Sequence, residues 1–327
     1  MPLIRRAAPW LLTLCLGAQA QEPVLLSLQE AEAKEVQARG FTLPRPMKVH
    51  VYARGTAAGR MAQGPFTAYG WILNAATREV VWQMDGRTSR PQRSFEVADA
   101  YLDLPAGSYE VYYTNHAYSG HSLFSTWTVN LDRRHLPAEE GRRHRGFLEG
   151  LRSHEVDRWR REVGWYGLQL SLAGGRAEEV GTFQAPLHWP LERISLTGLG
   201  DGDRRTRAFH LSRPVTLHLY AQGERSGERR FADTAWIQDV RTGKVVWSLD
   251  GAKAQYAGGA TKNRRQVETI TLPAGDYEAG VATDESHSPA DWNGAPPCDP
   301  LLYGLTVSLT QAADATAFSE RDHPRTA

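Results

Sequence analysis

The sequence predicts an all-β protein made of two tandem antiparallel β-sandwiches of the jelly-roll type. Short runs rich in aromatic and β-branched residues occur twice, in the same order, along the 327 residues. Turn-forming residues separate these runs, and no crossover helix lies between them, which is typical of antiparallel sandwiches. The chain is therefore a tandem duplication. The paired runs are 71–74 with 236–239, 80–86 with 245–251, 104–110 with 272–278, and 166–172 with 303–309.

The duplication sets the predicted domain organisation. We expect a first β-sandwich over 23–172, a connector over 173–190 and a second β-sandwich over 191–309. Residues 310–327 are polar and without periodicity, so we expect a disordered tail.

The first repeat carries an insertion. Glu110 and Tyr166 are 56 positions apart, whereas their counterparts Glu278 and Tyr303 are 25 apart. Within the insertion, residues of about 137–163 have the apolar spacing of a helix with a basic opposite face. A basic amphipathic helix indicates a membrane surface or an acidic partner. The alternative, which we favour, is a helix that covers the sandwich and exposes its charges to solvent.

Two turns can be interpreted from their residue types. In the second repeat, Gly243 occupies a hairpin position that suits a positive φ. Its counterpart in the first repeat is Arg78, so we expect a non-glycine residue to occupy or avoid the left-handed conformation, which costs about 1 kcal/mol. The Leu-Pro-Ala-Gly segments at 104–107 and 272–275 predict type I turns between strands.

The first twenty residues predict export. Arg5 and Arg6 precede an apolar run and a small-residue cleavage site, which is the pattern of a signal peptide over 1–20. We expect a periplasmic or extracellular location. Removal of the signal peptide leaves Cys298 as the one cysteine, so no intrachain disulfide is expected. A net charge of +1 gives no general attraction to nucleic acid.

A Pro-rich loop over 283–300 is the predicted functional site, because oxygen donors dominate it and the first repeat lacks it. Carboxylates of this kind suit Ca²⁺, so a calcium site is one interpretation and a loop capped by its own side chains is another. A third, which we favour slightly over the metal, is that Lys262, Arg264 and Arg265 neutralise the carboxylates. The metal ligands would be Asp284, Asp291 and Asp299. The predicted ligand-binding residues come from this loop and from a basic segment that is also confined to the second repeat: Asp284, Glu285, His287, Asp291, Trp292, Asn293, Lys262 and Arg264. Of the tryptophans, we expect Trp292 to be exposed.

An enzyme is the competing interpretation. A hydrolase of carbohydrate or peptide needs carboxylates across a cleft, and the sequence gives no reason to prefer any pair of them. No catalytic residue is assigned. The candidate carboxylates are Asp233, Asp250, Asp284 and Asp291.

The second repeat also resembles a known kind of module. The residues are Asp233-x-x-Trp236, Thr242-Gly243-x-Val245-Val246-Trp247, Leu272-Pro273-Ala274-Gly275-x-Tyr277 and Thr283 to Asn293. They resemble a β-sandwich module that recurs in exported bacterial proteins, and the modules look like pre-peptidase C-terminal and other jelly-roll accessory domains. The resemblance implies binding without catalysis.

Together these observations predict an exported, non-enzymatic binding or structural protein whose second repeat carries a loop for a protein or carbohydrate partner. No cofactor is expected apart from Ca²⁺. The alternatives are the hydrolase and a calcium-stabilised structural protein of the envelope.

Overall fold

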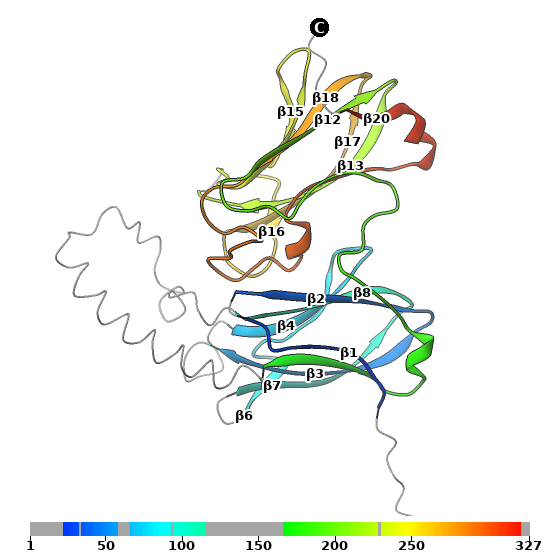
Figure 1. The fold of residues 1–327 in the computed structure, drawn as a ribbon, viewed down its shortest axis with the longest axis vertical. Coiled ribbons are helices and arrows are strands. Elements are labelled where there is room, and N and C mark those ends of the chain that lie inside the picture. The colour runs from blue at the N-terminus through cyan, green and yellow to red at the C-terminus, as the bar shows by residue number, and fades with distance from the viewer. Residues whose placement is uncertain are drawn as a thin grey trace, which may run out of the picture.

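The computed structural model consists of two β-sandwiches that lie one above the other (Figure 1). The described residues are 22–32, 34–57, 66–92, 95–115, 166–227 and 230–321. Every pairing between strands in these ranges is antiparallel, which confirms the all-β fold class. The predicted signal peptide and the predicted helix at 137–163 lie outside the described residues. No helix within the described ranges is long and apolar enough to cross a membrane.

The first sandwich has two faces that join where β3 pairs with β4, so its ten strands form one hydrogen-bonded sheet. One face has the order β1-β9-β3-β7-β6 and the other β5-β4-β8-β2-β10. The strands are β1 (Val24–Gln29), β2 (Val36–Leu43), β3 (Met47–Ala57), β4 (Phe66–Asn74), β5 (Val80–Gln83), β6 (Ser89–Gln92), β7 (Phe95–Leu104), β8 (Gly107–Asn115), β9 (Gly167–Leu172) and β10 (Gly181–Phe183). A 3₁₀ turn, η2 (Ala177–Glu179), precedes β10.

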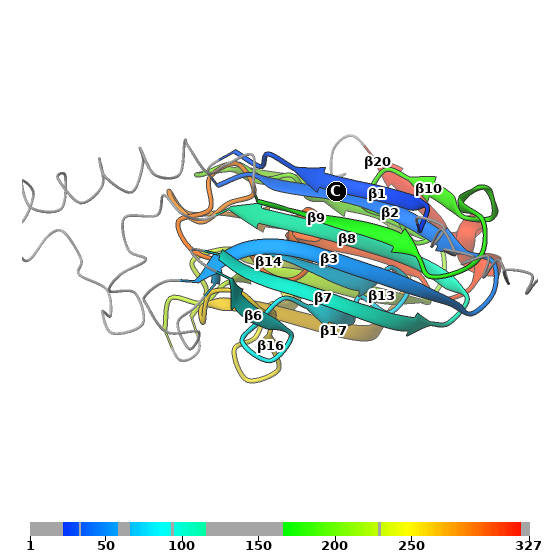
Figure 2. The ribbon, with the colours of Figure 1, turned by 90° about the horizontal axis from the view of Figure 1, so that it is seen from below.

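The second sandwich has the same strand order in two separate sheets, β11-β19-β13-β17-β16 and β15-β14-β18-β12-β20. Its strands are β11 (Glu192–Leu196), β12 (Arg204–Leu211), β13 (Val215–Glu224), β14 (Thr234–Asp239), β15 (Val245–Ser248), β16 (Gln255–Tyr256), β17 (Asn263–Leu272), β18 (Gly275–Ala282), β19 (Gly304–Leu309) and β20 (Phe318–Arg321). Two 3₁₀ turns, η3 (Pro300–Leu302) and η4 (Ala312–Ala317), flank β19. Figure 2 shows the strands of both layers running in similar directions.

The duplication extends to the packing of individual side chains. Phe41 stacks on Tyr109 at 5.3 Å between ring centroids, and Phe209 stacks on Tyr277 at 5.4 Å. Each tyrosine hydroxyl donates a hydrogen bond to the proline carbonyl four residues earlier, at 2.9 Å in the first repeat and 3.0 Å in the second. Each Leu-Pro-Ala-Gly turn is therefore fixed to its own core by the tyrosine that follows it.

Arg78 adopts the left-handed conformation in the hairpin of the first repeat, one of the two outcomes that the sequence left open. Gly243 has φ +69°, and Arg78 at the equivalent turn has φ +58°. A side chain in this conformation costs about 1 kcal/mol, and the contacts of Arg78 described below offset that cost.

Two segments predicted to lie outside the sandwiches belong to them. In the connector, β10 pairs with β2, and Val180 and Ala185 pack into the first core. The expectation of a disordered tail is wrong for 312–321, because β20 pairs with β12 and Phe318 stacks on Phe209 at 5.1 Å. The buried side chains of Ala317 and Phe318, together with the pairing of β20 with β12, hold a segment whose composition is otherwise polar.

Candidate functional site

The loop over 283–300 runs from β18 to β19 at the end of the second sandwich that faces the first (Figure 1). Its last residues contact the first repeat, and its first residues stay within the second. Cys298 and Leu301 pack against the core of the first sandwich. The loop thus joins the two sandwiches over part of its length.

Asp299 forms the centre of this joint with Arg78. The Nε and Nη2 atoms of Arg78 donate to Oδ2 and Oδ1 of Asp299 at 2.8 and 2.6 Å. On the same guanidinium, Nη1 and Nη2 donate to Oε1 and Oε2 of Glu110 at 2.7 and 3.1 Å. All three residues are buried, with 2%, 0% and 3% exposure for Arg78, Glu110 and Asp299. Such bidentate, charged pairs are among the strong hydrogen bonds that side chains make.

Neighbouring groups complete the hydrogen bonding of the two carboxylates. Tyr220 donates to Asp299 Oδ2 at 2.7 Å, and Gln222 Nε2 donates to the Asp299 carbonyl at 2.6 Å. Glu110 accepts from the Leu187 backbone at 2.6 Å and from the Tyr112 hydroxyl. Hydrogen-bond donors from both repeats and from the connector therefore surround the two acidic residues that bind Arg78.

The electrostatics keep Arg78 charged. Burial alone would lower its pKa, but the charges of Asp299 and Glu110 and the hydrogen bonds to them raise it above its usual value. Burial is also the main cause of the raised pKa of Tyr220, and the charge of Asp299 adds to it, so the phenol stays a donor.

Further contacts surround the joint. Trp71 Nε1 donates to the Cys298 carbonyl at 2.7 Å. Arg265 reaches from the second repeat to the Arg78 carbonyl at 3.0 Å and to Glu79 at 3.2 Å. At the rim, Lys34 and Asp291 form a salt bridge at 2.5 Å. These four polar contacts connect the repeats in addition to the Arg78–Asp299 pair.

The first half of the loop is fixed by a buried histidine. His287 is fully buried at φ +65°, with Nδ1 at 2.9 Å from Asn293 Oδ1 and Nε2 at 2.5 Å from Asn263 Oδ1. Asn263 Nδ2 donates to the carbonyls of Gly258 and Ala295, which fixes its amide oxygen toward the ring. Both ring nitrogens therefore lie within hydrogen-bond distance of an amide oxygen, which fixes the orientation of the imidazole ring.

Trp292 is 1% exposed and packs edge-on against His287 and Tyr303, at 4.9 and 5.2 Å between ring centroids. The expectation that Trp292 is exposed is therefore wrong, because the loop folds over it. The position of Trp292 on a Pro-rich loop gave no indication that its side chain is buried.

The loop and the segment that begins at Gly258 lie against each other. A Cβ on Gly258 would lie 2.1 Å from Cys298 Sγ, and a Cβ on Gly259 would lie 1.9 Å from the Pro296 carbonyl oxygen. Both glycines have positive φ. Glycine is required here for close approach and for backbone conformation at once.

The charged side chains of that segment have local roles. Lys262 bridges Glu224 Oε1 at 2.9 Å and Asn293 Oδ1 at 2.7 Å. Arg264 donates to the backbone carbonyls of Thr261 and Asn263. The structure thus brings Lys262, His287 and Asn293 together, but as a packed network and not as an open cleft.

The three predicted metal ligands do not meet. Asp299 is buried against Arg78, Asp291 pairs with Lys34, and Asp284 is exposed at the other end of the loop. Glu285 is also exposed beside Asp284. Instead, one carboxylate oxygen of Asp284 lies within 4.8 Å of one from Glu224 and one from Asp233.

Glu224 was not predicted as a site residue, and Asp233 was named only as a candidate carboxylate of a hydrolase. Burial raises the pKa of Asp233 to about 7, although the Tyr303 hydroxyl and the Asp284 N–H donate to its two oxygens. Burial also raises the pKa of Glu224, and the Lys262 charge opposes this. A signal was present in the duplication, because the matching positions of the first repeat hold Ala68 and Thr56.

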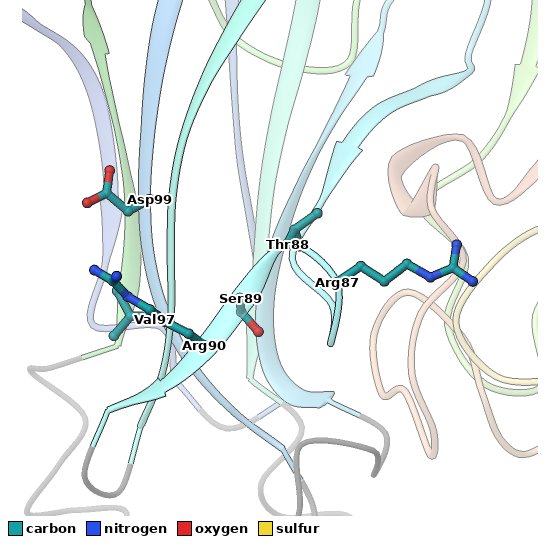
Figure 3. Close-up of a pocket in the computed structure, with 6 residues that line it drawn as sticks. All are labelled: Arg87, Thr88, Ser89, Arg90, Val97 and Asp99. Atoms are coloured by element: carbon teal, nitrogen blue, oxygen red, sulfur yellow. The ribbon is translucent and has the colours of Figure 1, made fainter.

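A separate polar hollow lies on the first repeat, between β6 and β7 (Figure 3). Figure 3 shows that Arg87 and Arg90 point in opposite directions, so the hollow does not gather its polar groups around one point. Its lining residues are Arg87, Thr88, Ser89, Arg90, Val97 and Asp99.

Comparisons with known proteins assign no family to this chain. No family model matches the chain. No curated protein matches it in sequence. Among solved structures, the CUB1-EGF-CUB2 domain of human MASP-1/3 matches at 10% identity over 86% of this chain and 98% of that chain, with a TM-score of 0.21. This similarity is too low to assign a family or a function.

Proposed function

We propose that the chain is an exported, non-enzymatic binding or structural protein in which the two sandwiches act as one rigid body. The loop over 283–300 is the joint, and its first partner is the first repeat of the same chain. The observation that carries the proposal is the buried Arg78–Asp299 pair, with 2.6 and 2.8 Å hydrogen bonds across the repeats.

A rigid role follows from the energetics of such a pair. Separating the sandwiches would leave Arg78 and Glu110 without Asp299 and would expose the Cys298 and Leu301 contacts. A small movement that breaks the pair while its charges stay buried would cost about 3–5 kcal/mol. The joint therefore opposes independent motion of the repeats.

The hydrolase alternative is less well supported, because Asp250 and Asp291 have structural tasks of their own, and oxygens of Asp233 and Asp284 lie within 4.8 Å of each other, closer than the two carboxyl groups of a glycosidase. Asp233 accepts from Tyr303 and from the backbone, Asp250 accepts from the Ala252 N–H, and Asp291 pairs with Lys34. A pair of carboxylates about 5–10 Å apart across an open cleft is what glycoside hydrolysis needs.

The external partner in this proposal is a protein or a carbohydrate outside the cytoplasm. His287, Trp292 and Asp299 are buried and are not available to it, whereas Asp284 and Glu285 are exposed. An external contact of the loop would then be made through its exposed residues, which also include Asp291 and Asn293.

One experiment distinguishes the two functions. The chain without residues 1–20 would be incubated with panels of polysaccharides and peptides, and its thermal unfolding would be followed by calorimetry. We expect no turnover and a single transition in which the calorimetric and van't Hoff enthalpies agree. Turnover that Asp284→Asn abolishes would favour the hydrolase, and two separate transitions would contradict the rigid body.

A further inference from the structure

Three carboxylates of the second repeat meet where three segments end together. Glu224 is the last residue of β13, Asp233 directly precedes β14, and Asp284 follows β18 by two residues. One carboxylate oxygen from each lies within 4.8 Å of the other two. Glu224 and Asp233 are buried, at 9% and 2% exposure, and Asp284 is exposed to solvent.

One oxygen in this cluster lacks a partner. Oε1 of Glu224 pairs with Lys262, but Oε2 has almost no solvent contact and accepts no hydrogen bond from the described residues. A buried carboxylate oxygen without a donor costs free energy that native structures normally avoid. This orphaned oxygen belongs to the same carboxylate that approaches Asp233 and Asp284.

Among the described residues, one cationic side chain, that of Lys262, forms a salt bridge with the cluster. The other donors are neutral: Tyr303 and the Asp284 N–H to Asp233, and Ser286 to Asp284. With the three carboxylates ionised, the sum is −3 plus +1 from Lys262, or −2.

We propose that this cluster is a calcium site, with Glu224, Asp233 and Asp284 as its protein ligands. Calcium binds carboxylate oxygens at about 2.3–2.6 Å, so two ligands on opposite sides of one ion are about 4.8 Å apart. The oxygens of the cluster fall within that span. Calcium also accepts irregular geometry, and the exposed side at Asp284 leaves room for the water ligands that complete its shell.

The site is confined to the second repeat. A Cβ on Gly223 would meet the Asp233 carbonyl oxygen at 2.2 Å, and a Cβ on Gly55 would meet the Ala68 carbonyl oxygen at 2.0 Å. Asp233 and Ala68 are therefore equivalent, and Glu224 corresponds to Thr56 one residue further along. Two of the three ligands are thus replaced by uncharged residues in the first repeat.

Terbium luminescence is a direct probe of this site. Tyr303 donates to Asp233 Oδ2 at 2.5 Å, and the Trp292 ring lies 5.2 Å from that of Tyr303. An ion at Asp233 therefore lies close enough to both rings for excitation energy to reach it. Tb³⁺ would be titrated into the chain without residues 1–20 and then displaced with Ca²⁺ from about 1 μM to about 10 mM, a range that includes the weak affinities of extracellular calcium modules.

The variants are Glu224→Gln and Asp284→Asn, with Glu285→Gln as the matched control because it removes an adjacent exposed carboxylate outside the cluster. We expect one saturable site in the wild type and in the control, and at least about tenfold weaker Ca²⁺ affinity in both cluster variants. Melting temperatures measured without calcium establish that each variant is folded, and Asp284→Asn, at an exposed position, serves if Glu224→Gln does not fold. No saturable displacement by Ca²⁺ in the wild type, or equal affinity in the control and the folded cluster variants, would overturn the proposal.

Discussion

Arg78 of the first repeat and Asp299 of the second form a buried, bidentate ion pair between residues 221 positions apart. Arg78 occupies the hairpin position that Gly243 holds in the second repeat, and both have positive φ. All five N–H groups of the guanidinium find acceptors: Asp299, Glu110 and the Ala75 carbonyl. The same turn therefore serves as a plain hairpin in one repeat and as an inter-repeat anchor in the other.

Replacing the arginine tests the anchor energetically. Arg78→Ala leaves the buried carboxylates of Glu110 and Asp299 without their cation, so we expect a loss of about 3–5 kcal/mol in the free energy of unfolding. Urea denaturation monitored by tryptophan fluorescence measures it. The control is Lys34→Ala, which removes an exposed salt bridge at the same interface and should cost at most about 1 kcal/mol. Equal losses in the two variants would show that burial of the pair contributes nothing.

Gly259→Ala tests the close packing of the loop against the neighbouring segment. Its Cβ would lie 1.9 Å from the Pro296 carbonyl oxygen in a left-handed backbone. Overpacking and the unfavourable φ together should cost about 2–4 kcal/mol, measured by chemical denaturation. Gly227→Ala, where a Cβ meets nothing within 4 Å, should change stability by no more than about 0.5 kcal/mol.

Cys298 should react slowly with thiol reagents in the folded protein. Burial raises the pKa of its thiol to about 11, and the charge of Asp299 adds to this effect. At pH 8 only about one thiol in a thousand is then the reactive thiolate. We expect slow modification by a disulfide reagent in buffer, rapid modification in urea, and an intermediate rate in Arg78→Ala. A native rate equal to the rate in urea would contradict the packed joint.

Phe318→Ala tests the ordered C-terminal strand. The ring is 7% exposed and stacks on Phe209, so its removal should cost about 3–5 kcal/mol by thermal or urea denaturation. The control is Glu320→Ala on the same strand, where the side chain is half-exposed and the effect should stay within about 0.5 kcal/mol. A negligible effect of Phe318→Ala would show that β20 does not contribute to the core.

Much of the fold was readable from the sequence because its signals are local. The Leu-Pro-Ala-Gly turns and the period of the strands each depend on residues a few positions apart. Whether Arg78 occupies the left-handed conformation was left open by the sequence, because that depends on its distant partners. The tail was misjudged because two buried apolar side chains, at 317 and 318, carry no periodicity.

The site was harder to predict because its contacts are distant in sequence. Nothing in the sequence near Asp299 indicates that its partner is Arg78. A loop rich in carboxylates also does not indicate which of its carboxylates lie close together in the fold. Asp233 and Glu224 were overlooked as a pair because each lies at a strand end with an ordinary pattern. Comparison of the two repeats, position by position, would have shown charged residues opposite Ala68 and Thr56.

The distance between the repeats in solution tests the rigid body most directly. Spin labels would be attached at the exposed positions Tyr101 and Val267, as Tyr101→Cys and Val267→Cys in a Cys298→Ala chain, and measured by pulsed dipolar spectroscopy. We expect one narrow distance distribution, which Arg78→Ala broadens. A broad distribution in the chain that retains Arg78 would contradict the account, because the sandwiches would then move independently despite the buried pair.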